Sequence, residues 1–153
     1  MFVLGGKDGI FSNSVRTVIK LRIHELAKKM KSIETGWKDC APMSNGRCLF
    51  AATVLDEQFI YVYGGIMGSN NKKPKLVDNL IERYDVKANK WSNITVEGAP
   101  KLSGFGWTLG KDQNELLVLG GTDGSTLQDD LWSIDLKAEK ARKTDLHYES
   151  ATG

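Results

Sequence analysis

A pair of adjacent glycines occurs three times in the chain, each time directly after a short run of apolar residues. The runs are FVLGG at residues 2–6, IYVYGG at 60–65 and LLVLGG at 116–121, so the pairs lie 59 and 56 residues apart. Short runs rich in β-branched and aromatic residues that stop at turn residues predict buried strands. Repetition at a nearly constant spacing of this length is typical of a repeat protein. We therefore expect a chain built from copies of one β-rich unit.

The middle copy shows the order of strands in the unit. We expect one strand over residues 47–55, a turn, and a second strand over 59–63 that ends at the glycine pair. A polar loop is predicted to about residue 79. A third strand over 80–85, a turn, and a fourth strand from Trp91 toward Val96 complete the copy. Four short strands in each repeat are typical of a propeller blade.

The two outer copies follow the same order less completely. The third copy predicts strands over 104–109, 115–119, 130–136 and 140–146. The first copy begins in the strand that ends at its glycine pair, and it lacks the opening strand of the other two. Residues 14–24 of this copy predict a strand, because apolar and charged residues alternate from 19 to 23, and a further strand is expected at Trp37. The expected blades span residues 1–43, 44–100 and 101–153.

Composition and charge exclude some classes of function. The chain carries 21 Lys and Arg against 19 Asp and Glu, and this near balance gives no support for a nucleic-acid-binding surface. No apolar run is long enough for a transmembrane helix, so no membrane partner is expected. Cys40 and Cys48 suggest neither a disulfide framework nor a metal site, but two isolated thiols. Such thiols suit a reducing compartment, and we expect a cytoplasmic protein.

Residues 36–65 and 80–91 resemble kelch repeats. In such a repeat a Gly-Gly pair ends one strand, a Tyr-Asp pair ends the next, and a tryptophan follows. The middle copy has Gly64-Gly65, Tyr84-Asp85 and Trp91 at these positions. The outer copies carry the markers Gly5-Gly6 and Trp37, and Gly120-Gly121 and Ile134-Asp135. Ala141 stands where the third tryptophan is expected, and Ile23-His24 would align with Tyr-Asp in the first copy, which leaves Trp37 too far along the chain.

The resemblance implies an all-β fold of kelch-type blades, each with four antiparallel strands. Propellers contain about four to eight blades, and this chain supplies about three, so an incomplete, open propeller is expected. Three explanations stay open: a fragment of a longer reading frame, a ring of several copies, and a stable open array. Unpaired strand edges at either end of the array would invite self-association or the missing blades.

The glycine pairs and the aromatic residues each allow a functional and a structural interpretation. No phosphate-binding motif follows any glycine pair, so close packing of the backbone is favoured over a phosphate cradle. The aromatic residues predict a core between blades, although stacking on a sugar or base is the alternative. This aromatic set is Trp37, Trp91, Trp132, Tyr61, Tyr63 and Tyr84.

Two groups of residues are candidates for partner contact. In the predicted polar loop, Lys72, Lys73 and Lys75 form a basic run that suits an acidic partner or a phosphate, or is simply solvated. In the matching loop of the third copy, Asp123, Asp129 and Asp130 could neutralise this run, bind a cation or cap turns. The resemblance also implies a ligand-facing arginine at Arg47, with a structural salt bridge as the alternative. Ser103 takes the equivalent place in the third copy.

Catalysis is poorly supported by the sequence. His24 and His147 lie near no nucleophile–base pattern, and no cluster has the spacing of a metal site, so no cofactor is expected. The expected function is a protein-interaction module that binds a protein partner through loops on one propeller face. The alternatives are a kelch-fold enzyme acting on a sugar or small organic acid, and a structural component of a larger assembly. Some kelch proteins are adaptors of ubiquitin ligases, a role that we do not assign.

Overall fold

The computed structural model describes residues 2–6, 14–21, 37–69, 72–78 and 80–144. These residues form β-strands and connecting turns without any helix, as the sequence predicted. The first sheet contains β1 (Phe2–Leu4), β2 (Val18–Leu21) and β3 (Trp37–Asp39), in that order and antiparallel.

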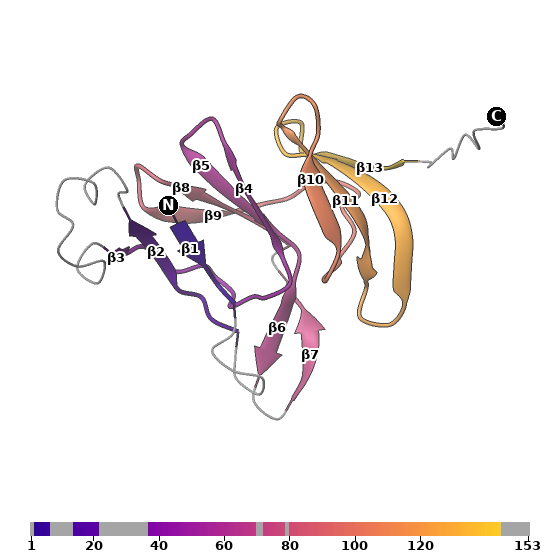
Figure 1. The fold of residues 1–153 in the computed structure, drawn as a ribbon, viewed down its shortest axis with the longest axis horizontal. Helices are drawn as coiled ribbons and strands as arrows, with labels where there is room; N and C mark the ends of the chain where they lie inside the picture. Colours follow the sequence, from indigo (N-terminus) through magenta and orange to yellow (C-terminus); the bar gives the residue numbers. More distant parts are fainter. Residues whose placement is uncertain (1, 7–13, 22–36, 70–71, 79, 145–153) are drawn as a thin grey trace, which may run out of the picture.

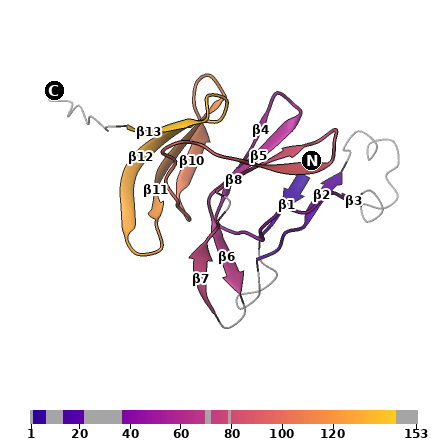
Figure 2. The same ribbon diagram turned by 180° about the vertical axis from the view of Figure 1, so that it is seen from behind.

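The second and third sheets each contain four antiparallel strands. The second has the order β4 (Ala51–Leu55), β5 (Phe59–Tyr63), β8 (Ile81–Asp85) and β9 (Lys90–Ile94). The third has β10 (Gly106–Leu109), β11 (Glu115–Thr122), β12 (Leu127–Asp135) and β13 (Lys140–Thr144). Figures 1 and 2 show the second sheet between the other two, which is the arrangement of blades in an open propeller.

Several predicted boundaries are wrong, among them the start of the strand predicted over residues 14–24, since β2 begins at Val18. Residues 47–50 precede β4 as an irregular segment, in which Leu49 has a positive φ of 57° that interrupts a strand. The predicted polar loop contains a hairpin of β6 (Ile66–Ser69) and β7 (Lys72–Leu76). The third-copy loop is also shorter than predicted, because β11 continues through its glycine pair and β12 begins at Leu127.

The turns between strands explain the aspartate of the Tyr-Asp pair. Asp85 ends β8, and its carboxylate accepts hydrogen bonds from the backbone N–H groups of Lys87 and Ala88, both at 2.9 Å. Asp135 ends β12 and caps its turn in the same way. These N–H bonds, of which that from Ala88 has the largest effect, lower the pKa of Asp85. The aspartate therefore fixes the turn that leads into the last strand of the second and third sheets.

Strand register corrects the alignment of the first repeat. The residue before each glycine pair has a cross-strand partner, which is Val18 for Leu4, Ile81 for Tyr63 and Leu131 for Leu119. Leu21 lies three residues after Val18, as Tyr84 lies three residues after Ile81. Leu21, and not Ile23, therefore stands at the position of Tyr84. Trp37 then pairs with Leu21 as Trp91 pairs with Tyr84. Trp37 therefore occupies the marker position, after an insertion in the sequence between residues 22 and 36. These residues, which include Ile23 and His24, lie outside the part of the chain that the structure describes.

The core lies between the sheets. Between the second and third sheets, a large apolar cluster buries side chains of both, among them Tyr63, Ile81, Leu116, Val118 and Ile134. Between the first and second sheets the buried cluster is smaller, with Val18, Met43 and Val62 at its centre. Ala141 pairs with Ile134, so alanine does stand at the third tryptophan position, as predicted.

Candidate functional site

The first two glycine pairs lie where one sheet meets the segment that leads into the next. We call residues 47–50 and 102–105 the lead-in segments of the second and third sheets. The N–H of Gly6 donates to the carbonyl of Arg47 at 3.0 Å, and that of Gly65 to the carbonyl of Leu102 at 2.9 Å. At Gly64, which has a φ of +68°, a Cβ atom would lie 2.5 Å from the Leu102 carbonyl oxygen. The glycines therefore permit close packing of sheets, the interpretation favoured over a phosphate cradle.

Arg47 is fully buried beside an acidic residue. Its Nη2 forms an ion pair with Glu82 on β8, and both side chains are 0% exposed. Its Nη1 donates to the Gly64 carbonyl at 3.0 Å, and the other Glu82 oxygen accepts the N–H of Ser44 at 2.8 Å. Burial lowers the pKa of Arg47, against the opposing effect of Glu82. The guanidinium nevertheless stays charged at neutral pH, as arginine does in proteins.

The third sheet replaces this ion pair with apolar residues. Leu102 is the counterpart of Arg47, because the carbonyl of each accepts a hydrogen bond from the second glycine of a pair. Ser103 is the counterpart of Cys48, because Ser103 bridges to Thr122 as Cys48 bridges to Ile66. The predicted equivalence of Ser103 and Arg47 is therefore wrong by one residue. The partner of Val118 in the register is Trp132, so Trp132 takes the place of Glu82.

Arg47 and Ser103 do not reach solvent in this arrangement. Arg47 is 0% exposed and Ser103 is 2% exposed. The structure thus supports the salt-bridge alternative for Arg47, and direct contact of either residue with a partner stays a prediction. The sequence analysis missed Glu82, whose signal was a carboxylate directly after the apolar Leu80 and Ile81 in a predicted strand.

The basic run lies on the β6–β7 hairpin. Lys73 and Lys75 are exposed, and Lys72 begins β7. Lys75 lies 3.4 Å from the carboxylate of Asp78, but both side chains are about two-thirds exposed, so this pair contributes little. Gly68 of the hairpin donates its N–H to Ser14 Oγ at 2.7 Å, which ties the hairpin to the chain before β2.

The turn between β11 and β12 lies next to the hairpin. A Cβ atom at Gly124 in this turn would lie 3.9 Å from Leu76 of β7. Asp123 caps the turn by accepting the N–H groups of Ser125 and Thr126, both at 2.8 Å, and these bonds, with that of Thr126 the stronger influence, lower its pKa. Turn capping is therefore supported for Asp123. Asp130 pairs with Lys143 at 2.6 Å.

Segments associated with all three sheets thus meet at one end of the molecule. They are the chain around Ser14, the β6–β7 hairpin and the β11–β12 turn, and we call them together the loop end. Figure 1 shows the hairpin and the β11–β12 turn on the same side, opposite the β4–β5 and β10–β11 turns.

Comparison with known proteins agrees with the repeat pattern. The family model described as "Kelch motif" matches residues 46–95. The chain belongs to the kelch-repeat family. It is 35% identical over 95 residues to "Kelch-like protein 40" of Xenopus laevis. The matched region is 62% of this chain and 13% of that protein. It is 30% identical over 132 residues to "Spermatocyte protein spe-26" of Caenorhabditis elegans, which covers 86% of this chain and 20% of that protein. This kelch chain therefore spans a fifth or less of these relatives.

Three of the predicted aromatic residues have their polar atoms satisfied inside the fold. Trp91 Nε1 donates to the Ala41 carbonyl at 2.8 Å, Tyr84 donates to Asn89 Oδ1 at 2.6 Å, and Tyr63 to the Pro100 carbonyl at 2.6 Å. Burial raises the pKa of both Tyr63 and Tyr84 above the usual range for tyrosine. These contacts support a packing role over stacking on a ligand.

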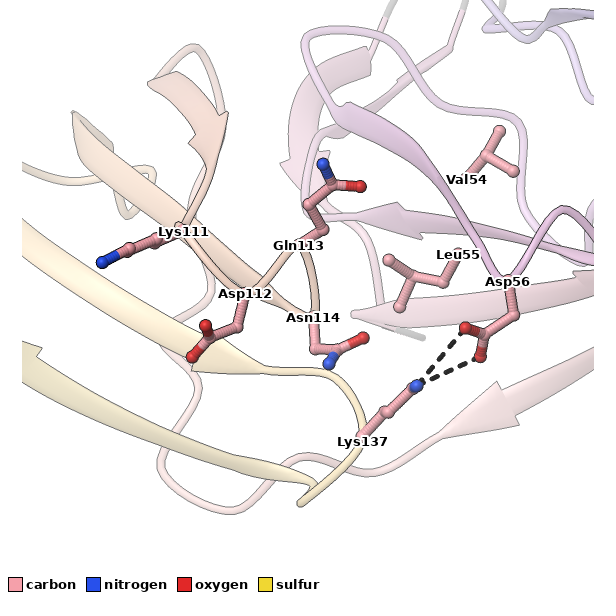
Figure 3. Close-up of a pocket in the computed structure, with 8 residues that line it drawn as sticks. All are labelled: Val54, Leu55, Asp56, Lys111, Asp112, Gln113, Asn114 and Lys137. Carbon is pink, nitrogen blue, oxygen red and sulfur yellow. Dashed lines mark hydrogen bonds and ion pairs between the residues drawn. The ribbon is translucent and has the colours of Figure 1, made fainter.

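A polar cleft lies opposite the loop end. It has a volume of about 400 Å³ and lies between the β4–β5 and β10–β11 turns of neighbouring kelch blades (Figure 3). Lys137 reaches across it to Asp56, with Nζ 3.2 Å from Oδ2. Its remaining lining residues are Val54, Leu55, Lys111, Asp112, Gln113 and Asn114. This lining contains neither histidine nor cysteine.

A cluster that could hold a metal ion is not found in the part of the chain that the structure describes. In that part, histidine, cysteine and carboxylate side chains nowhere gather in threes with the geometry of a metal site. His24 and His147, the two histidines, lie outside it. Over the same residues, no helix with the length and apolar character of a membrane span is found.

Proposed function

We propose that this kelch chain is a protein-interaction module whose loop end binds a segment of a protein partner. The observation that carries the proposal is the convergence of three segments at the loop end, joined by the Ser14–Gly68 hydrogen bonds and the approach of Gly124 to Leu76. Because sheets hold these segments in place, a partner would meet a preorganised surface, which lowers the entropic cost of binding.

The charge of the hairpin favours an acidic partner segment. Lys73 and Lys75 are exposed, and Lys72 adjoins them. Clustered exposed charge of one sign attracts a partner of the opposite sign and accelerates its association, most strongly at low salt.

We also propose that blades divide near residues 44 and 101. The free Cys40 and Cys48 suit action in the reducing cytoplasm.

Fluorescence anisotropy with a labelled peptide of alternating glutamate and serine tests this function. The wild-type chain should bind the peptide at low salt, and the triple variant Lys72→Glu, Lys73→Glu, Lys75→Glu should lose binding. The matched control is Lys111→Glu, an exposed lysine at the opposite end of the sheets. Equal binding by the triple variant, or equal loss in the control, would contradict a role for the hairpin.

A structural role in a larger assembly is the second candidate. It is favoured by exposed large apolar residues on the third sheet, since Leu119 is 49% exposed and Leu127 is 89% exposed. Exposed apolar area of this kind marks interaction surfaces in soluble proteins. Size-exclusion chromatography with light scattering tests this role: concentration-dependent association is expected, and a strict monomer at all concentrations would count against it.

A further inference from the structure

A small pocket lies where the chain passes from the β6–β7 hairpin into β8 and where it leaves β9. The pocket has a volume of about 200 Å³ and is lined by Asp78, by residues 80–81 and by residues 93–96. Because β7 ends at Leu76, the pocket begins two residues after the hairpin. We call it the hairpin pocket.

The buried side of the hairpin pocket is aliphatic. Ile81 is 1% exposed and Val96 is 9% exposed, and Leu80 and Ile94 are half-buried. These four side chains belong to the apolar cluster between the second and third sheets or pack against it. The polar lining residues are exposed and lie at the rim, namely Asp78, Asn93 and Thr95. A group that enters the pocket would therefore meet hydrocarbon inside and polar atoms at the mouth.

Hydrogen bonds to the second glycine pair hold one wall of the pocket in place. The Val77 N–H donates to the Gly65 carbonyl at 3.1 Å, and the Gly64 N–H donates to the Leu80 carbonyl at 2.8 Å. The Leu80 carbonyl also accepts Arg47 Nη1 at 3.3 Å. Because this wall is already fixed, a bound group would order little of the protein, which lowers the entropic cost of binding.

The aliphatic lining is not a requirement of the repeat. In the third sheet Asp130 stands at the register position of Leu80, and it pairs with Lys143 at 2.6 Å. Thr144 stands at the position of Ile94. A sheet of this kind therefore forms with polar residues at both places, so folding of the sheet does not by itself account for the aliphatic lining of the hairpin pocket.

Asp78 connects the pocket to the basic hairpin. It lines the pocket, and its carboxylate lies 3.4 Å from Lys75 Nζ. Both side chains are about two-thirds exposed, so Lys75 can exchange this carboxylate for one of a ligand at little cost. A partner segment with an acidic group on Lys75 would then bring a neighbouring side chain to the mouth of the pocket.

We propose that the hairpin pocket receives one aliphatic side chain of the acidic segment that binds the loop end. At about 200 Å³ the pocket is smaller than those that take whole small molecules, about 300–1,000 Å³, and it suits a single side chain of leucine size. The proposal rests on the proposed function, because the hairpin lysines would guide the segment to the pocket. It adds an apolar anchor, which gives a specificity that charge alone does not provide.

A leucine probe tests the pocket by itself. N-acetyl-leucinamide is titrated into isotope-labelled protein and followed by amide NMR shifts, with N-acetylglycinamide as the control probe that lacks the side chain. The leucine probe alone should shift residues 80–81 and 93–96, in the wild type and in the triple lysine variant alike.

Thr95→Phe should abolish these shifts, because Thr95 is an exposed lining residue whose enlargement fills the mouth of the pocket. The matched control is Ser92→Phe, at an exposed position on β9 outside the lining, which should leave the shifts unchanged. Equal shifts in Thr95→Phe and the wild type would overturn the proposal, and so would a wild type that does not respond to the leucine probe.

Leucine-bearing peptides connect the pocket to the loop end. In the alternating glutamate and serine peptide, leucine replaces each serine in turn, and anisotropy gives the Kd. At one position leucine should strengthen wild-type binding about tenfold, as expected for burial of one such side chain. Thr95→Phe should lose this gain, and Ser92→Phe should keep it.

The outcomes separate the two proposals. If leucine strengthens binding at no position while the triple lysine variant still loses binding, the pocket proposal fails and the proposed function stands. If the wild type binds none of the peptides although the leucine probe shifts the pocket residues, the acidic segment is overturned and the aliphatic pocket stands.

Discussion

The two junctions between neighbouring sheets share a backbone arrangement and differ in their buried side chains. At the first junction, Arg47 and Glu82 form a buried ion pair beside a small apolar cluster. At the second, Leu102 and Trp132 occupy those positions within a large apolar cluster. Breaking a buried ion pair is costly although the intact pair adds little net stability, whereas apolar burial contributes in proportion to area. The first junction should therefore be the more sensitive to single substitutions and the less stabilised overall.

The largest expected effect comes from Arg47→Leu. It leaves Glu82 charged and buried without its ion-pair partner, and such losses typically lower the free energy of unfolding by about 3–5 kcal/mol. Urea denaturation followed by tryptophan fluorescence measures the loss.

The double variant Arg47→Leu, Glu82→Leu is the matched control for the ion pair. It should recover at least half of the loss, because it gives the first junction an apolar pair like that of the second. A double variant as unstable as the single one would mean that the loss comes from packing of Arg47 and not from the stranded charge.

At the second junction, Leu102→Ala should lower the free energy of unfolding by about 3 kcal/mol, since Leu102 is 3% exposed and its truncation leaves a cavity. The control is Leu119→Ala on β11, which should cost less than about 1 kcal/mol because the side chain already contacts water. Equal losses in the two variants would show that Leu119 is covered in solution.

Tyr63→Phe removes one hydrogen bond from the second junction and keeps the ring. The loss of the bond to the Pro100 carbonyl should cost about 1 kcal/mol. Burial raises the pKa of Tyr63 in the fold, so its contribution is fully present below the ordinary tyrosine pKa of 10.0 and is lost as pH rises through the folded value. Alkaline denaturation curves should therefore fall less steeply for Tyr63→Phe than for the wild type.

The smallest effect is expected from Lys137→Gln, which removes the exposed ion pair with Asp56 at the rim of the second junction. Both side chains are at least half exposed, so the loss should not exceed about 1 kcal/mol. It should vanish in about 1 M salt, where the Debye length falls to about 3 Å, whereas the Arg47→Leu loss should persist. A salt-independent loss at Lys137 would indicate that this rim is buried in a larger assembly.

Local sequence was sufficient to predict strands that are bounded by turns. β5 and β8 coincide with residue runs that stop at glycine or aspartate. The bounds of both strands were predicted to within one residue. The β6–β7 hairpin was missed because Pro74 and its neighbouring lysines show no alternation of apolar and polar residues. The insertion before Trp37 was misaligned because only strand pairing relates Trp37 to Leu21.

The candidate site was harder to predict because it depends on contacts between distant residues. The basic run could be predicted directly, since a cluster of lysines in a polar segment is usually exposed. The burial of Arg47 could not, because its partner Glu82 lies 35 positions away and reaches it only when β8 is in place beside β5. Ser103 was matched to Arg47 instead of Cys48 for a similar reason, because its counterpart in the second sheet can be identified only from its bridge to Thr122.

The hydrogen bonds from Gly6 and Gly65 to the next lead-in segment use backbone atoms on both sides. Beyond its need for the glycine pair, this contact does not depend on which side chains are present, so one unit can be followed by any other that presents a carbonyl at the same place. Units of a kelch chain could thus be duplicated, exchanged or allowed to diverge, as residues 47 and 102 have, while the backbone contact that joins them is kept.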